Sequence, residues 1–123
     1  LHLPLTNDSA LLLNEARIAT MKPGAILVNC ARGGLIDEAA LAAALGTGHV
    51  FAAALDTFGQ EPPVGNALLS MENTVVTPHC AGATIDNIAA VAARAVENAT
   101  LFVSGAPLPA ADVVVPPLRG FHG

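Results

Sequence analysis

The sequence has few basic residues, with five Lys and Arg against ten Asp and Glu in 123 residues and a formal net charge of −5. The acidic charge is spread along the chain, and no basic stripe could neutralise the phosphates of a nucleic acid. The longest apolar runs are too short to cross a bilayer. We therefore expect neither nucleic-acid binding nor a membrane span.

Cysteine is also scarce. Cys30 and Cys80 have no CxxC spacing, and we expect two small buried thiols in a reducing compartment, the cytoplasm, with no disulfide between them. Four histidines without carboxylates at ligand spacing predict no metal site. Leu1 opens the chain without a Met or a basic segment, so we expect no signal peptide. The stretch "LHLPLT" is typical of a chain entered midway.

Apolar runs and capping residues alternate along the chain. The stretch "LHLPL" is typical of the end of a buried strand, and a Pro-rich tail predicts extended backbone. Asp37 is placed as the N-cap of a helix that Gly46 and Gly48 end. Strands are predicted over 25–29, 49–56 and 73–77, and helices over 10–21 (capped by Asn7, Asp8 or Ser9) and 86–105 (capped by Thr84 or Asp86), with a helical turn over 67–72.

This alternation predicts an α/β fold with a parallel sheet whose apolar strands are covered on both faces. Ligands of such sheets bind outside the carboxyl ends of the strands. Arg32, Asp56 and His79 each stand at or just past the end of a predicted strand. We therefore expect these three polar side chains to converge on one edge of the sheet.

Arg32 lies among small residues in "CARGG". Because Ala31, Gly33 and Gly34 remove bulk around it, a ligand can approach the backbone closely. A guanidinium group in such a place suits bidentate recognition of a carboxylate. The alternative is a surface arginine in a turn.

His79 lies on a predicted loop, in "TPHCAGAT", where an imidazole can give or take a proton near neutral pH. Glu61 could pair with it and favour its protonated form. The alternatives are a histidine satisfied by a backbone carbonyl and a solvated loop carboxylate. Asp56 is either a strand-end cap or an acceptor for the amide or ribose of a nicotinamide nucleotide.

The segments "VNCARGGLIDEAALAAAL", "AALDTFGQEPP" and "VVTPHCAGAT" together resemble the D-isomer-specific 2-hydroxyacid dehydrogenases. The resemblance implies a Rossmann-like, doubly wound parallel sheet, of which this chain is the second half. Residues 1–103 would form the C-terminal half of the NAD-binding domain with its return helix. Residues 104–123 would be a tail that belongs to the substrate domain.

The resemblance also implies roles for individual residues. Arg32 would hold the substrate carboxylate, His79 would be the general acid/base, and Glu61 would tune that histidine. The nicotinamide side of NAD would lie near Cys30, Ala31, Arg32, Asp56, His79, Ala81 and Gly82, and the adenosine end near Leu3 and Pro4. NADP stays open, because the chain contains no G-x-G-x-x-G with its following acidic residue.

The implied activity is reversible hydride transfer between NAD(P)H and a small 2-oxo acid, in a protein that forms homodimers. A dinucleotide-binding corepressor or scaffold on the same fold is the alternative, as is a catalytically silent fragment. We expect this piece alone to be inactive, and to self-associate through the sheet edge it exposes. The substrate itself stays open.

Overall fold

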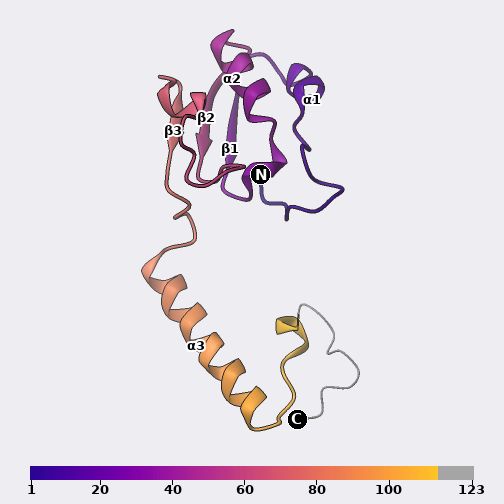
Figure 1. Ribbon diagram of the computed structural model, residues 1–123, viewed down its shortest axis with the longest axis vertical. Helices are drawn as coiled ribbons and strands as arrows, with labels where there is room; N and C mark the ends of the chain where they lie inside the picture. The colour runs from indigo at the N-terminus through magenta and orange to yellow at the C-terminus, as the bar shows by residue number, and fades with distance from the viewer. Residues whose placement is uncertain (114–123) are drawn as a thin grey trace. The chain divides into compact units, whose positions relative to one another are not determined.

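The computed structural model describes residues 1–113, and the chain divides into two compact units, residues 1–81 and residues 82 onward. The first unit contains a parallel sheet of three strands in the order β1-β2-β3 (Figure 1). These strands are β1 (Ala25–Asn29), β2 (Val50–Leu55) and β3 (Thr74–Val76). The predicted α/β architecture and the three predicted strands are confirmed.

Helix α2 (Glu38–Gly46) begins where the sequence predicts. The Asp37 carboxylate accepts a hydrogen bond from the Ala40 amide at 3.0 Å and so satisfies one free amide of the first turn. The helix ends before Gly48, whose φ of 76° is a backbone conformation that side chains disfavour. The helical turn predicted over 67–72 is a 3-10 helix, η2 (Ala67–Ser70).

The helix predicted over 10–21 is wrong in its length and in its cap. Helix α1 spans only Glu15–Ala19, and the Asn14 side chain caps it by accepting from the Arg17 amide. Upstream, Leu13 forms a parallel bridge with Ile36 in extended backbone, and Leu11 has a φ of 50°. Pairing with the segment before α2 therefore takes precedence over the helical tendency of this stretch.

The first residues also differ from expectation, because "LHLPL" forms no strand. A single hydrogen bond, from the Leu1 amino group to the Val28 carbonyl at 2.6 Å, joins it to the edge of β1. Beyond that bond the chain turns away from the sheet: Ser9 Oγ donates to the Pro4 carbonyl. The prediction of a strand end at this position is therefore wrong.

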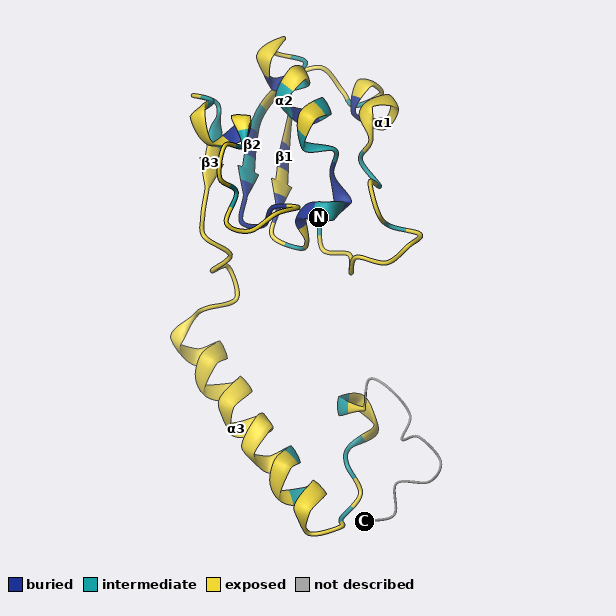
Figure 2. Ribbon diagram, viewed as in Figure 1, coloured by how far each residue is buried: buried dark blue, intermediate teal, exposed yellow. Residues whose placement is uncertain are grey.

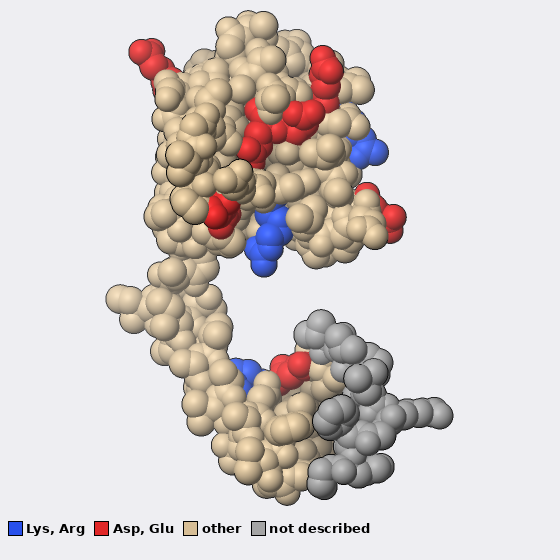
Figure 3. Space-filling view, in the orientation of Figure 1, with Lys and Arg blue, Asp and Glu red and all other residues tan. Residues whose placement is uncertain are grey.

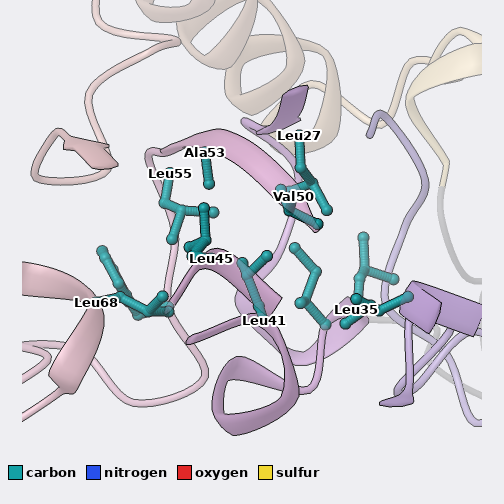
Figure 4. Packing of buried hydrophobic residues seen from close by; sticks show 11 residues of the cluster. Leu27, Leu35, Leu41, Leu45, Val50, Ala53, Leu55 and Leu68 are labelled. Atoms are coloured by element: carbon teal, nitrogen blue, oxygen red, sulfur yellow. The ribbon is translucent and has the colours of Figure 1, made fainter. Parts of the chain in front are cut away.

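The apolar core lies on one face of the sheet, between it and α1 and α2, and reaches η2 (Figure 4). It has eleven buried apolar side chains, and Leu35, Leu41, Val50 and Leu68 are wholly buried. On the other face Ile26, Phe51 and Val75 are 63%, 64% and 66% exposed, and Figure 2 draws β3 mainly in the colour of exposed residues. Within the described residues, the expectation of strands covered on both faces holds for one face only.

The second unit contains helix α3 (Ile85–Val103) and a 3-10 turn, η3 (Ala110–Asp112). The helix predicted over 86–105 is confirmed, with Thr84 as its N-cap residue. Arg94 joins the two elements, because its Nε lies 2.7 Å from a carboxylate oxygen of Asp112. The last part of the predicted extended tail, 114–123, lies outside the described residues, and the predicted boundary after residue 103 stays a prediction.

None of the helices described is both long and apolar enough to span a membrane. On the face drawn in Figure 3, the Lys and Arg side chains are few and scattered, and they form no basic patch.

Candidate functional site

The carboxyl ends of the three strands lie at one edge of the sheet, because the strands are parallel and adjacent. Backbone hydrogen bonds continue past the strand ends and hold the following loops together. The Asp56 amide donates to the Asn29 carbonyl at 3.0 Å, and the Thr77 amide donates to the Leu55 carbonyl at 3.0 Å. The loops that carry Arg32, Asp56 and His79 therefore begin side by side.

His79 and Glu61 form an ion pair, with 2.9 Å between His79 Nδ1 and Glu61 Oε2. A carboxylate only accepts hydrogen bonds, so Nδ1 carries the proton in this pair. The other ring nitrogen, Nε2, makes no hydrogen bond to the described residues and is free for proton exchange with a ligand. His79 itself has a φ of 54°, which turns the chain sharply between β3 and Ala81.

Glu61 is fixed by a second hydrogen bond, since its Oε1 accepts from the Phe58 amide at 3.0 Å. The bond from His79 and then the bond from Phe58 lower the pKa of Glu61 below its ordinary value. Glu61 is therefore a carboxylate at neutral pH and stabilises a positive charge on the neighbouring imidazole.

Asp56 is a buried carboxylate, 3% exposed, at the end of β2. Oδ1 accepts from the Thr77 hydroxyl and from the Cys80 amide at 2.8 Å, and Oδ2 accepts from the Ala81 amide at 2.9 Å. Burial raises the pKa of Asp56, but the hydrogen bonds from Thr77, Ala81 and Cys80, together with the electrostatic influence of His79, lower it below its ordinary value. Asp56 therefore holds the loop on both sides of His79.

The Arg32 loop is held by a buried side chain at the end of β1. Asn29, which is wholly buried, donates through Nδ2 to the Arg32 carbonyl at 2.9 Å and accepts from the Ala31 amide at 3.1 Å. The Arg32 side chain is exposed, and its one hydrogen bond to the described residues is to the Ala31 carbonyl at 2.7 Å. Its other guanidinium donors are available to a ligand.

The predicted site residues line two hollows of the first unit. One hollow is open and has a volume of about 760 Å³. It is lined by Arg32 with its neighbours Cys30 and Ala31, and by His2, Leu3, Pro4 and Leu5 near the start of the chain. A mainly apolar hollow of about 360 Å³ is lined by Asp56, Glu61, His79 and the apolar residues around them. No hydrogen bond joins Arg32 to the histidine pair among residues 1–113.

Three further predicted residues are Gly82, Cys30 and Cys80. Gly82 begins the second unit, where its carbonyl accepts from the Asn87 side chain at 2.6 Å. The expectation of buried thiols is wrong: Cys30 and Cys80 are both free and exposed, because each lies in a loop just past a strand end.

Sequence reasoning missed Asn29 and Thr77, which hold the loops of Arg32 and His79. A signal existed for Asn29, because it is the one polar residue in the strand "AILVN". No comparable signal pointed to Thr77. Within the described part of the chain, no three His, Cys, Asp or Glu side chains are placed to hold a metal ion.

Comparison of the sequence and of the structure with known proteins finds the same family of dehydrogenases. The family model "D-isomer specific 2-hydroxyacid dehydrogenase, NAD binding domain" matches residues 1–81. The chain is 48% identical over 107 residues to D-3-phosphoglycerate dehydrogenase of Bacillus subtilis, and the match covers 87% of this chain and 20% of that protein.

Solved structures agree. A D-isomer specific 2-hydroxyacid dehydrogenase from Xanthobacter autotrophicus, in complex with NADPH and MES, matches with a TM-score of 0.72 and 45% identity, over 87% of this chain and 44% of that one. D-lactate dehydrogenase from Aquifex aeolicus, complexed with NAD and lactic acid, matches with a TM-score of 0.77 and 31% identity, over 85% and 36%. The chain thus spans less than half the length of each of these proteins.

Proposed function

Because this chain belongs to the D-isomer specific 2-hydroxyacid dehydrogenase family through its NAD-binding domain, we propose that its gene product interconverts a 2-oxo acid and a D-2-hydroxy acid. The observation that carries this proposal is the 2.9 Å pair of His79 and Glu61 at the carboxyl edge of the sheet. It leaves Nε2 of a protonated imidazole free to give its proton to a developing alkoxide.

In the reducing direction, His79 protonates the carbonyl oxygen as negative charge grows there, and the Glu61 carboxylate stabilises the imidazolium before transfer. In the oxidising direction the neutral imidazole takes the hydroxyl proton back. Glu61 accepts from both Phe58 and His79, so the ring keeps one orientation through the cycle. This arrangement supplies the acid/base step alone.

Arg32 binds the carboxylate of the same acid. Its guanidinium is exposed, it keeps free donors, and Asn29 fixes the backbone on which it stands. Bidentate contact would hold the carboxylate in a plane and so orient the adjacent carbonyl group. The domain division after residue 103, with a tail in the substrate domain, is part of the same proposal.

The residues present fit the nicotinamide part of a dinucleotide. The hollow beside Cys30, Ala31 and Arg32 is open, and Oδ2 of Asp56 accepts only one hydrogen bond among the described residues. Leu3 and Pro4 on the same hollow would contact the adenosine end. When bound, the cofactor supplies the hydride for the carbonyl carbon.

We propose NAD as the cofactor, with NADP as the alternative. One solved relative holds NADPH and another holds NAD.

The free thiols of Cys30 and Cys80 suit a reducing compartment, so we propose the cytoplasm. We propose a homodimer as the assembly, which light scattering would test.

The test is a nicotinamide absorbance assay of the complete gene product with a panel of small 2-oxo acids. His79→Asn is the first variant, because Asn tolerates the left-handed backbone that His79 adopts. Loss of general acid catalysis should lower kcat by about 10²- to 10⁴-fold. Arg32→Gln should raise KM for the oxo acid, since it removes the charge that binds the carboxylate.

Arg17→Gln is the matched control for Arg32. Arg17 also donates to a backbone carbonyl, that of Leu12 at 2.9 Å, but it lies in α1. Its replacement should leave KM unchanged. Binding of NAD or NADP without turnover of any oxo acid would contradict the proposed enzyme and support a dinucleotide-binding scaffold.

A further inference from the structure

Glu38 is the first residue of α2 and lies outside the two hollows, yet both of its carboxylate oxygens are used. Oε1 accepts from the Gly59 amide at 2.6 Å, and Oε2 accepts from Nδ2 of Asn66 at 2.6 Å. These partners stand at the two ends of the segment 59–66, which contains Glu61. One side chain thus holds both ends of the loop that carries the partner of His79.

The rest of this loop has few other attachments. Its start is fixed by Phe58, which is buried, and by Gly33, where a Cβ atom would collide with the backbone of Phe58 and Gly59. Its end is fixed by Asn66, whose Oδ1 accepts from the Leu68 amide at 3.0 Å and caps η2. Between these points Glu61 itself is exposed. Core packing therefore does not position the Glu61 side chain.

From this geometry we propose that Glu38 is a positioning residue for the acid/base pair: it holds the loop 59–66 so that Glu61 reaches His79. The inference rests on the proposed function, since it assigns Glu38 a role in that reaction. It also links the two halves of the site. Residues 32–37 lead directly from Arg32 into α2, so Glu38 ties the loop of Glu61 to the segment that carries the arginine.

A simpler role for Glu38 is that of an acidic residue in the first turn of α2, which interacts favourably with the helix dipole. The two roles predict different results. A helix role concerns the negative charge alone, whereas a positioning role depends on which atoms donate and which accept. The hydrogen-bond pattern with Asn66 allows the roles to be separated by exchanging donor and acceptor.

The experiment uses Glu38→Gln, Asn66→Asp and the double variant in the complete gene product. In Glu38→Gln, whichever way the amide turns, one of its two donor partners loses an acceptor. In Asn66→Asp, two carboxylates face each other. In the double variant the new amide at position 38 donates to the new carboxylate at position 66. The amide oxygen at position 38 still accepts from Gly59, and the cap of η2 is kept.

The first readout is the dependence of kcat/KM on pH for reduction of a 2-oxo acid. Two charged groups act on His79. They are Glu61, which contacts its ring, and Asp56 at the end of β2. Displacing Glu61 removes the carboxylate that accepts from Nδ1 of His79, so the pH profile should change as it does when Glu61 itself is replaced. We expect each single variant to shift the profile in the direction of a Glu61→Gln reference, with kcat about tenfold lower, and the double variant to recover both.

The second readout needs no activity. Amide hydrogen exchange across residues 58–66 should be about tenfold faster in each single variant, because a charge-assisted hydrogen bond is lost, and should return to the wild-type rate in the double variant. If both single variants leave the pH profile unchanged and Glu38→Gln alone lowers the melting temperature, Glu38 serves the helix alone and the proposal is overturned.

The two proposals can fail separately. A wild-type protein that reduces no 2-oxo acid, but shows the predicted exchange pattern, would refute the proposed function and leave the Glu38 contacts standing. An active wild-type enzyme whose exchange rates do not respond to either single variant would refute the positioning role and leave the function intact.

Discussion

Replacing Asp56 by Asn should destabilise the loop that carries His79 far more than the small chemical change suggests. The carboxylate accepts three hydrogen bonds, from Thr77, Cys80 and Ala81, and is 3% exposed. If the Asn oxygen takes the place of Oδ1, the Asn amide group faces the Ala81 amide and two donors are opposed. A buried donor left unsatisfied costs about 1–3 kcal/mol, and the remaining bonds lose their charge assistance. We expect a loss of about 3 kcal/mol.

The assay is amide hydrogen exchange of the segment 78–81, read by mass spectrometry in the complete gene product, together with the melting temperature. A loss of about 3 kcal/mol corresponds to exchange about a hundredfold faster, at about 1.4 kcal/mol per factor of ten. Asp37→Asn is the matched control, because Asn caps helices as well as Asp does, and among residues 1–113 the Asp37 carboxylate accepts from one amide. Equal effects of the two substitutions would refute the reasoning.

The effect of Asp56→Asn on stability should also depend on pH. A carboxyl group whose pKa is lower in the folded state stabilises the fold fully above its unfolded-state pKa, here 3.8, and this contribution is lost as the pH falls through the folded-state value. The difference in melting temperature between wild type and Asp56→Asn should therefore be constant from neutral pH to about pH 5 and narrow below that. A difference that widens on acidification would contradict the assignment.

Three further substitutions test other parts of the fold. Asn29→Ala removes the buried amide that holds the Arg32 loop and should cost about 2 kcal/mol in urea unfolding, with a higher KM for the oxo acid. Gly33→Ala places a Cβ against the backbone of a neighbouring segment and should lower the free energy of unfolding by about 3 kcal/mol or more. In its control, Gly46→Ala, the new Cβ meets nothing within 4 Å, and the substitution should stabilise α2 by about 0.5 kcal/mol. Phe51→Lys on the exposed face of the sheet should reduce self-association of the 123-residue piece in light scattering; an unchanged mass distribution would contradict that.

Most of the fold follows from local patterns. The apolar runs ending in Asn29 and Asp56 are strands, and the Asp37 cap and Gly48 bound α2 as predicted. The helix over 10–21 fails because its boundaries depend on pairing between Leu13 and Ile36. These residues are far apart in the sequence, and their pairing leaves no local trace.

In the candidate site, too, some residues could be predicted from local patterns, whereas contacts between distant residues could not. Arg32, Glu61 and His79 could be singled out because a polar residue at a strand end stands out against its apolar strand, and because the segments resemble a family. The residues alone left two alternatives for Glu61, a pair with His79 or a solvated loop carboxylate, and the resemblance favoured the pair that the structure shows at 2.9 Å. The contacts of Glu38 and Thr77 were not predicted, since a Glu at a helix start and a Thr before a Pro are common without any partner.

The way in which Asp56 holds His79 bears on how this loop can vary. Asp56 binds the amides of Cys80 and Ala81 and touches neither side chain through a hydrogen bond. Both residues are exposed, so most amino acids at these two positions would preserve the loop. Proline is the exception, because it has no amide hydrogen to donate. The side chains beside His79 can therefore vary while its position is kept, and a saturation library at positions 80 and 81 should tolerate broad replacement and reject proline.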